Sequence, residues 1–80
     1  MILKNLPYLG AIAFYLKNSF PNSKIEVWSE DSMFMNGYIA IVAKVDDAFA
    51  YTTISPELVV SERHISDILV ARIKEVWNNG

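Results

Sequence analysis

The chain has 80 residues, of which 52% are hydrophobic and 20% charged, and its nine Asp and Glu outnumber seven Lys and Arg to give a net charge of −2. This composition excludes an intrinsically disordered chain and predicts a single domain, 1–80, while the mildly acidic balance disfavours nucleic-acid and anionic-membrane binding. Because cysteine is absent, a disulfide framework, a thiolate nucleophile and a cysteine-bound metal site are excluded as well.

A first helix is expected from about Leu6 to Asn18, because Asn5 can cap its start and Pro21 disfavours helical geometry just beyond its end. Apolar residues follow one side of this helix at helical spacing: Leu9, Ile12, Ala13, Leu16 and Phe20. The reverse side is apolar too, carrying Tyr8, Ala11, Phe14 and Tyr15. The helix therefore needs cover on two sides.

The uncharged run within this helix, Leu6 to Leu16, raises the question of a membrane or export segment. It is much shorter than the ~20 residues that cross a bilayer. It also lacks the small residues of a signal-peptide cleavage site before Lys17 and Phe20. We expect no membrane contact and a cytoplasmic protein.

Three strands follow, predicted at Lys24–Ser29, Tyr38–Val45 and from Ala48 to about Ile54. The Asn36-Gly37 dipeptide favours a tight hairpin turn before the second strand, with residues 30–37 forming either a loop or an extension of the first strand. Asp46-Asp47 is a two-residue turn between the second and third strands. Alternation predicts two faces that both carry apolar residues, one of them holding Tyr38, Phe49 and Tyr51.

A second helix is predicted from Glu62 to Trp77 with Ser61 as its cap, after a short helical turn that starts at Pro56 and runs through Val60. Its expected buried stripe consists of Ile65, Ile68, Leu69, Ile73 and Val76. The predicted fold class is therefore α+β, a two-layer αβββα sandwich in which both helices cover one face of an antiparallel meander.

The order of the predicted elements and the chain length resemble those of double-stranded-RNA-binding domains. Such domains carry a basic cluster at the start of the last helix. The corresponding residues here are Ser61-Glu62-Arg63-His64, which lack a Lys-Lys pair. The resemblance is one of architecture and does not extend to the family.

Residues that could carry chemistry are few and poorly spaced. His64 and Asp67 can share a helix face, but two ligands do not complete a zinc site. The carboxylate pairs Glu30-Asp31 and Asp46-Asp47 are typical of solvated turns. We therefore predict no catalytic residue, no bound cofactor and no metal ion, and hence a protein that is not an enzyme.

Charge is segregated along the chain, since residues 25–62 hold seven carboxylates and only one basic side chain, Lys44. This acidic region also contains aromatic residues that are candidates for contact with a partner. The sequence thus predicts a protein–protein interaction protein, such as an inhibitor or a phage-type accessory factor, that binds a basic protein surface. The partner-binding residues expected are Trp28, Glu30, Asp31, Tyr38, Asp46, Asp47, Phe49 and Tyr51.

Two alternatives remain open at this stage. In the first, the protein is a homo-oligomeric structural or assembly subunit whose interface is the reverse side of the first helix, with Tyr8, Ala11, Phe14 and Tyr15. Arg72 of the second helix is added to this interface because a guanidinium within an apolar arc needs a partner. In the second, the sheet aromatics stack nucleic-acid bases, which the acidic region disfavours. The triplet Met33-Phe34-Met35 serves either recognition or core packing.

Overall fold

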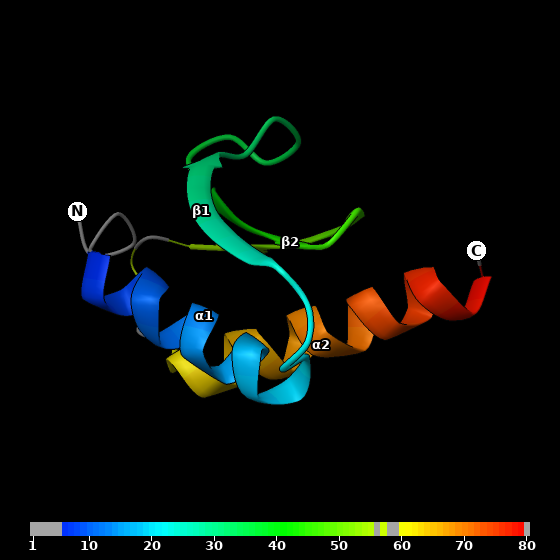
Figure 1. Ribbon diagram of the computed structural model, residues 1–80. Coiled ribbons are helices and arrows are strands. Elements are labelled where there is room, and N and C mark those ends of the chain that lie inside the picture. Colours follow the sequence, from blue (N-terminus) through cyan, green and yellow to red (C-terminus); the bar gives the residue numbers. More distant parts are fainter. Residues whose placement is uncertain (1–5, 56, 58–59, 80) are drawn as a thin grey trace.

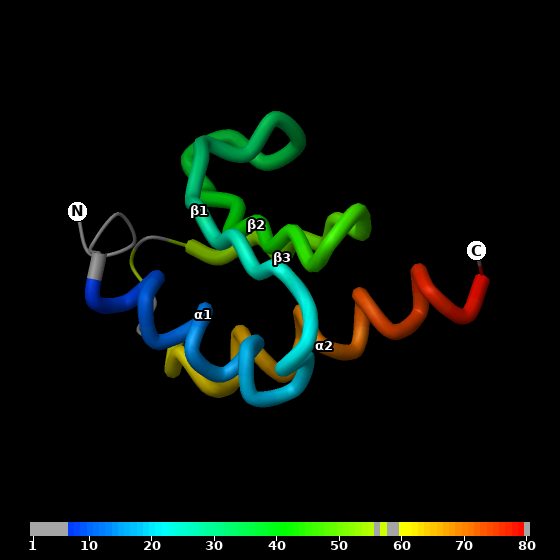
Figure 2. The backbone as a smooth tube through the Cα atoms, viewed as in Figure 1, coloured from blue at the N-terminus to red at the C-terminus, as the bar shows by residue number. Residues whose placement is uncertain are grey.

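A computed structural model describes residues 6–55, 57 and 60–79 of the chain. Helix α1 (Leu6–Ser19) precedes strands β1 (Ile25–Asp31), β2 (Ile39–Val45) and β3 (Ala48–Ile54), and helix α2 (Glu62–Asn79) follows them (Figure 1). The smooth trace shows how the two helices run beside each other beneath the strands (Figure 2). The predicted order of elements is confirmed.

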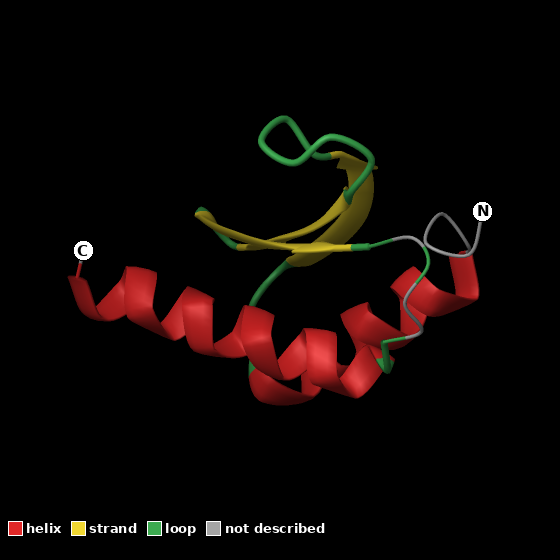
Figure 3. Ribbon diagram, turned by 180° about the vertical axis from the view of Figure 1, so that it is seen from behind, coloured by secondary structure: helices red, strands yellow, loops and turns green. Residues whose placement is uncertain are grey.

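The elements form two layers, with both helices on one face of the sheet and its other face uncovered by any helix (Figure 3). The strand order is β1-β2-β3, and both neighbouring pairs are antiparallel. Helix α1 packs under β1, helix α2 packs under β3, and the two helices contact each other. The predicted α+β fold class, a two-layer αβββα meander, is therefore confirmed.

The observed ranges of both helices agree closely with the predicted ranges and differ only at the ends. Helix α1 extends one residue further than predicted, to Ser19, and Phe20 packs its ring edge-on to Trp77 with 5.0 Å between centroids. Ser61 caps α2, because its Oγ accepts a hydrogen bond from the His64 amide at 3.1 Å. Helix α2 ends at Asn79 rather than Trp77.

The buried side of α2 is narrower than its sequence pattern. Ile65, Leu69 and Ile73 are fully buried as predicted, whereas Ile68 is only half-buried and Val76 is exposed. Val76 lies near the end of α2, which extends beyond the turn between β2 and β3 (Figure 1). Ser66 joins the buried side because its hydroxyl donates to the Glu62 carbonyl at 2.7 Å.

The sheet places alternate residues of β2 and β3 on opposite faces, as the sequence predicted. Ile41, Ala43 and Val45 of β2 are fully buried and belong to the core between sheet and helices. On the other face, Val42 of β2 lies directly between its cross-strand partners, Trp28 of β1 and Tyr51 of β3. Both faces therefore carry apolar side chains, although helices cover only one.

Two connections set the shape of the sheet. The Asp46-Asp47 turn is the predicted two-residue hairpin loop, and Asp46 has a positive φ of 54°. The tight two-residue turn expected at Asn36-Gly37 is wrong in extent, because β1 runs on to Asp31 and β2 begins at Ile39, which leaves a seven-residue loop, 32–38. Gly37, with φ of 82°, still supplies a turn within that loop.

Some expectations concern residues outside those that the structure describes. They include the cap at Asn5 and most of the short helical turn from Pro56 to Val60. Among the described helices, none is long and apolar enough to cross a membrane.

Candidate binding surface on the open sheet face

The loop 32–38 connects β1 to β2 and arches over the open face of the sheet (Figure 3). Ser32 organises it, because its Oγ accepts hydrogen bonds from the amides of Phe34 and Met35 at 3.2 and 3.1 Å. The Tyr38 amide closes a turn on the Met35 carbonyl at 3.0 Å. These bonds satisfy the backbone locally, so the loop keeps its shape while its apolar side chains stay outside the core.

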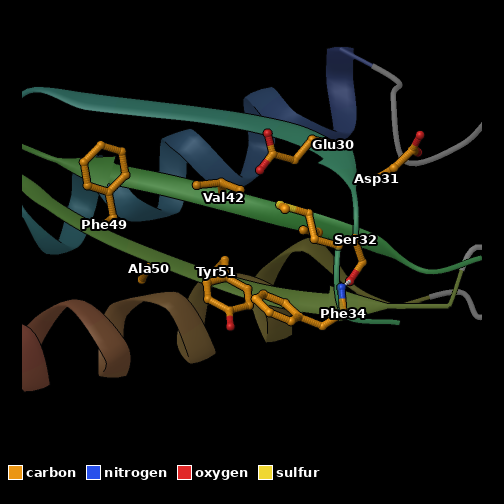
Figure 4. Close-up of a pocket in the computed structure, with 10 residues that line it drawn as sticks. Glu30, Asp31, Ser32, Phe34, Val42, Phe49, Ala50 and Tyr51 are labelled. Atoms are coloured by element: carbon orange, nitrogen blue, oxygen red, sulfur yellow. Dashed lines mark hydrogen bonds between the residues drawn. The ribbon is translucent and has the colours of Figure 1, made fainter. Parts of the chain in front are cut away.

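A cavity of about 240 Å³ opens between this loop and the sheet. Its walls come from the end of β1, the loop, and the open faces of β2 and β3, and the lining residues are Glu30, Asp31, Ser32, Met33, Phe34, Ala40, Val42, Phe49, Ala50 and Tyr51 (Figure 4). We call this the loop pocket. The small side chain of Ala40 leaves space that a larger residue at this position would fill, whereas the Ala50 side chain belongs to the core on the other face of the sheet.

The mouth of the loop pocket is acidic. Glu30 extends over the sheet and Asp31 points away from the other labelled side chains (Figure 4). Both carboxylates are exposed, and among the described residues neither lies within ion-pair distance of a basic group. The loop pocket thus joins an apolar floor to a rim whose negative charge comes from Glu30.

Beyond the loop pocket, the open face carries a cluster of aromatic and charged side chains. Trp28 packs edge-on against Phe49 with 6.3 Å between centroids, and the Lys44 ammonium lies 5.5 Å from the centre of the Phe49 ring. The same ammonium lies 3.9 Å from a carboxylate oxygen of Glu26, the residue opposite it in register. The only basic side chain of the acidic region therefore has a carboxylate, that of Glu26, as its neighbour.

The structure brings together five of the eight residues predicted to bind a partner. Glu30, Asp31, Phe49 and Tyr51 line the loop pocket, and Trp28 adjoins it through Phe49. Three others do not line it: Tyr38, Asp46 and Asp47. The two aspartates lie at the hairpin turn, at the other end of β2 from the loop.

Asp46 has a structural task at that turn. Its Oδ1 accepts a hydrogen bond from the Lys24 amide at 3.0 Å, while its own amide donates to the Lys24 carbonyl at 2.9 Å. The hydrogen bond from Lys24, followed by one from Ser23, lowers the pKa of the Asp46 carboxyl below its ordinary value. This carboxylate fastens the start of β1 to the β2–β3 turn.

Two pocket residues, Met33 and Phe34, were not among the predicted binding residues. They are 91% and 80% exposed, so the loop presents them to solvent rather than packing them into the core. The apolar triplet 33–35 was the sequence signal that pointed to them. Among its two interpretations, the exposures favour recognition over core packing.

The residues predicted for an oligomer interface fall on two separate surfaces. On α1, Phe14 is 63% exposed with its ring edge-on to Tyr15, and Ala11 is half-buried. The Tyr8 hydroxyl donates a hydrogen bond to the Val60 carbonyl at 2.7 Å, which fixes this side chain. Burial, with a smaller effect of Glu62, raises the pKa of Tyr8. Arg72 lies elsewhere, in a groove between α2 and β3.

The loop pocket can hold a side chain that is both aliphatic and cationic. The stem of a lysine or arginine would lie on the apolar floor, and its charged end would reach the carboxylate of Glu30. Among the described residues, no three histidines or carboxylates lie close enough to hold a metal ion. No protein-family model, curated protein or solved structure matches this chain.

Proposed function

We propose that this chain is a small non-enzymatic interaction protein whose loop pocket docks onto a basic segment of a partner protein. The observation that carries the proposal is the loop pocket itself, an apolar cavity of about 240 Å³ with Glu30 and Asp31 at its mouth. A role as an inhibitor or accessory factor of a phage or mobile element, and a cytoplasmic location, belong to the same proposal and rest on small size and charge segregation.

Energetics favour a partner that supplies both apolar contact and positive charge. Exposed Met33 and Phe34 provide adaptable apolar surface whose burial against a partner is favourable. The exposed carboxylates are worth little as isolated ion pairs, but they steer a cationic partner towards the pocket and disfavour an acidic one. Affinity thus comes from the loop and the floor, and selectivity comes from the rim.

Selection from a random dodecapeptide library displayed on phage tests this proposal without a known partner. We expect enriched peptides to combine Lys or Arg with large apolar residues. The double variant Glu30→Lys/Asp31→Lys should lose this enrichment, and Phe34→Ser should weaken it. Asp47→Lys is the matched control, since it reverses an exposed carboxylate outside the loop pocket and should keep the enrichment.

Three results would contradict the proposal. The first is a library that yields no enriched family above an unrelated control protein. The second is enrichment of acidic or uncharged peptides only. The third is equal loss of binding in the loop-pocket variant and in Asp47→Lys, which would mean that overall charge rather than the pocket governs binding.

Stacking of nucleic-acid bases is the alternative that the same face offers, through Trp28, Phe49 and Tyr51. The carboxylate of Glu30 lies on the same face as these rings and repels phosphates, so the face favours a cationic partner. A fluorescent oligothymidine at low salt separates the two functions. Tight binding that weakens steeply with added salt would replace the proposed function by nucleic-acid binding.

A further inference from the structure

Strand β3 forms an open edge of the sheet, because in the described part of the chain it pairs with β2 alone. The two-residue turn makes Val45 and Ala48 a hydrogen-bonded pair, so the backbone groups of alternate residues from Ala48 point to β2. The backbone N–H and C=O groups of Phe49, Tyr51 and Thr53 therefore point away from β2, towards the open edge of the sheet. Strand β3 contains no charged residue and no proline, so it lacks the features that keep other strands from pairing there.

The opposite edge of the sheet, formed by β1, is less suited to pairing with another strand. Strand β1 carries Glu26, Glu30 and Asp31, and it bends strongly along its length (Figure 1). Charges and curvature are the devices by which natural sheets prevent edge pairing. These features disfavour extension of the sheet through β1, so pairing of two copies through β3 disfavours further growth into a filament.

A groove lies along the β3 edge, between the strand and α2, with a volume of about 460 Å³. Its strand side is formed by Phe49, Ala50 and Tyr51, and its helix side by Arg72, Glu75, Val76 and Asn79. Val76 and Tyr51 are each nearly half exposed in it. Arg72 and Glu75, which have opposite charges, stand one helical turn apart on the same wall.

We propose that a second copy of this chain occupies the edge, its β3 pairing antiparallel with the first β3 about a two-fold axis at Tyr51. In this register Tyr51 pairs with its counterpart and Phe49 pairs with Thr53 of the other copy. All outward backbone groups of these residues are then satisfied by about six hydrogen bonds. The contact is isologous and closes after two copies.

Charge in the groove supports the choice of a second copy as the occupant. A two-fold axis that passes beside Tyr51 also passes the wall that holds Arg72 and Glu75, because the three residues share the groove. Because the axis reverses the direction of α2, an axis that crosses the helix between residues 72 and 75 places Arg72 of each copy opposite Glu75 of the other. The groove is therefore complementary in charge to itself, and the part of Val76 that is exposed in the groove becomes buried.

The dimer does not depend on the proposed binding function. It joins two meanders into a six-stranded sheet with all helices on one side, and it leaves each loop pocket open on the other side. Phe49 and Tyr51 line both the loop pocket and the groove, so the two pockets lie on either side of the new central strand pair. A partner with two basic segments would contact both at once.

Sedimentation equilibrium from low micromolar to near-millimolar concentration tests the dimer. We expect the natural sequence to associate to a dimer and no further. Arg72→Glu and Glu75→Arg each place like charges across the axis and should raise the dissociation constant about tenfold or more, whereas the double swap Arg72→Glu/Glu75→Arg should restore it. Lys74→Glu is the control, since it reverses an exposed charge of α2 outside the groove and should change little.

Far-ultraviolet circular dichroism establishes that each variant is folded. A monomer at every concentration would overturn the dimer, even if an extended peptide from another protein bound the β3 edge. So would a dimer that Phe14→Glu dissociates while Arg72→Glu does not, which would assign association to α1. Failure of the double swap to restore association would overturn the two-fold arrangement. None of these results bears on the peptide selection that tests the loop pocket.

Discussion

The two sheet faces should differ sharply in how much they stabilise the fold, and two substitutions measure the difference. Ile41 points to the helices and is fully buried, whereas Phe49 points to the open face and is 55% exposed. The prediction is that Ile41→Ala destabilises the protein severely and Phe49→Ala only mildly. If so, the open face is available to a partner because folding does not require it.

The magnitudes follow from burial. Ile41→Ala removes about three buried carbon atoms at about 0.8 kcal/mol each and leaves a cavity between the sheet and the helices, so we expect a loss of about 3 to 4 kcal/mol in the free energy of unfolding. Phe49→Ala loses less than half of a buried phenyl ring and its contact with Trp28, so the loss should be about 1 to 2 kcal/mol. A domain of this size has about 4 to 12 kcal/mol in total.

Equilibrium unfolding in urea, followed by far-ultraviolet circular dichroism, gives both values. Trp28 fluorescence is less suitable, since Phe49→Ala changes the surroundings of that indole directly. All variants are compared at one low protein concentration and with equal slopes against urea, because association shifts the midpoint. If Phe49→Ala costs as much as Ile41→Ala, the open face is part of the core and the proposed binding surface loses its basis.

Three further predictions concern the helix cap and the turns. Ser61→Ala removes the acceptor of the His64 amide and should lower the free energy of unfolding by about 1 kcal/mol in urea titrations, whereas an unchanged value would mean that α2 needs no cap. Gly37→Ala forces a side chain into a backbone with φ of 82°, so its melting temperature should fall by an amount equivalent to about 1 kcal/mol; no change would show that the turn readjusts freely. The lowered pKa of Asp46 means that its ionised form is favoured in the folded state, so its contribution is present above the pKa of the unfolded chain and disappears as pH falls through the folded pKa. Asp46→Asn should therefore weaken the acid sensitivity of stability, and equal acid unfolding curves for both proteins would contradict the Lys24 contact.

The fold was largely predictable because its strongest signals are local. Alternation from Ile39 to Ile54 and a two-residue turn at Asp46-Asp47 leave no freedom in the register of β2 and β3, since a slip by one residue would exchange the two faces. The loop 32–38 was not predictable in the same way. Ser32 stabilises it through hydrogen bonds to nearby amides, and such bonds compete with the tight turn that Asn36-Gly37 alone indicates.

The candidate site was predictable in composition but not in grouping. Charge counting identified Glu30 and Asp31, yet it also included Asp46, whose carboxylate is occupied by the Lys24 amide. Arg72 lies within the apolar arc of α2 by helical angle, but its part of the helix borders the open β3 edge, so its guanidinium reaches solvent. The surroundings of Arg72 depend on which strand forms the edge of the sheet. Sequence spacing does not indicate which strand that will be.

The contact between α1 and α2 has a consequence for synthesis on the ribosome. These helices begin and end the described fold, and Ile12 and Leu16 of α1 share one core with Ile65, Leu69 and Ile73 of α2. The meander can pair its strands earlier, since its contacts are between neighbours in the chain. A nascent chain that has not yet released α2 lacks the part of the core that Ile65, Leu69 and Ile73 supply, and its fate depends on how quickly this helix of eighteen residues emerges.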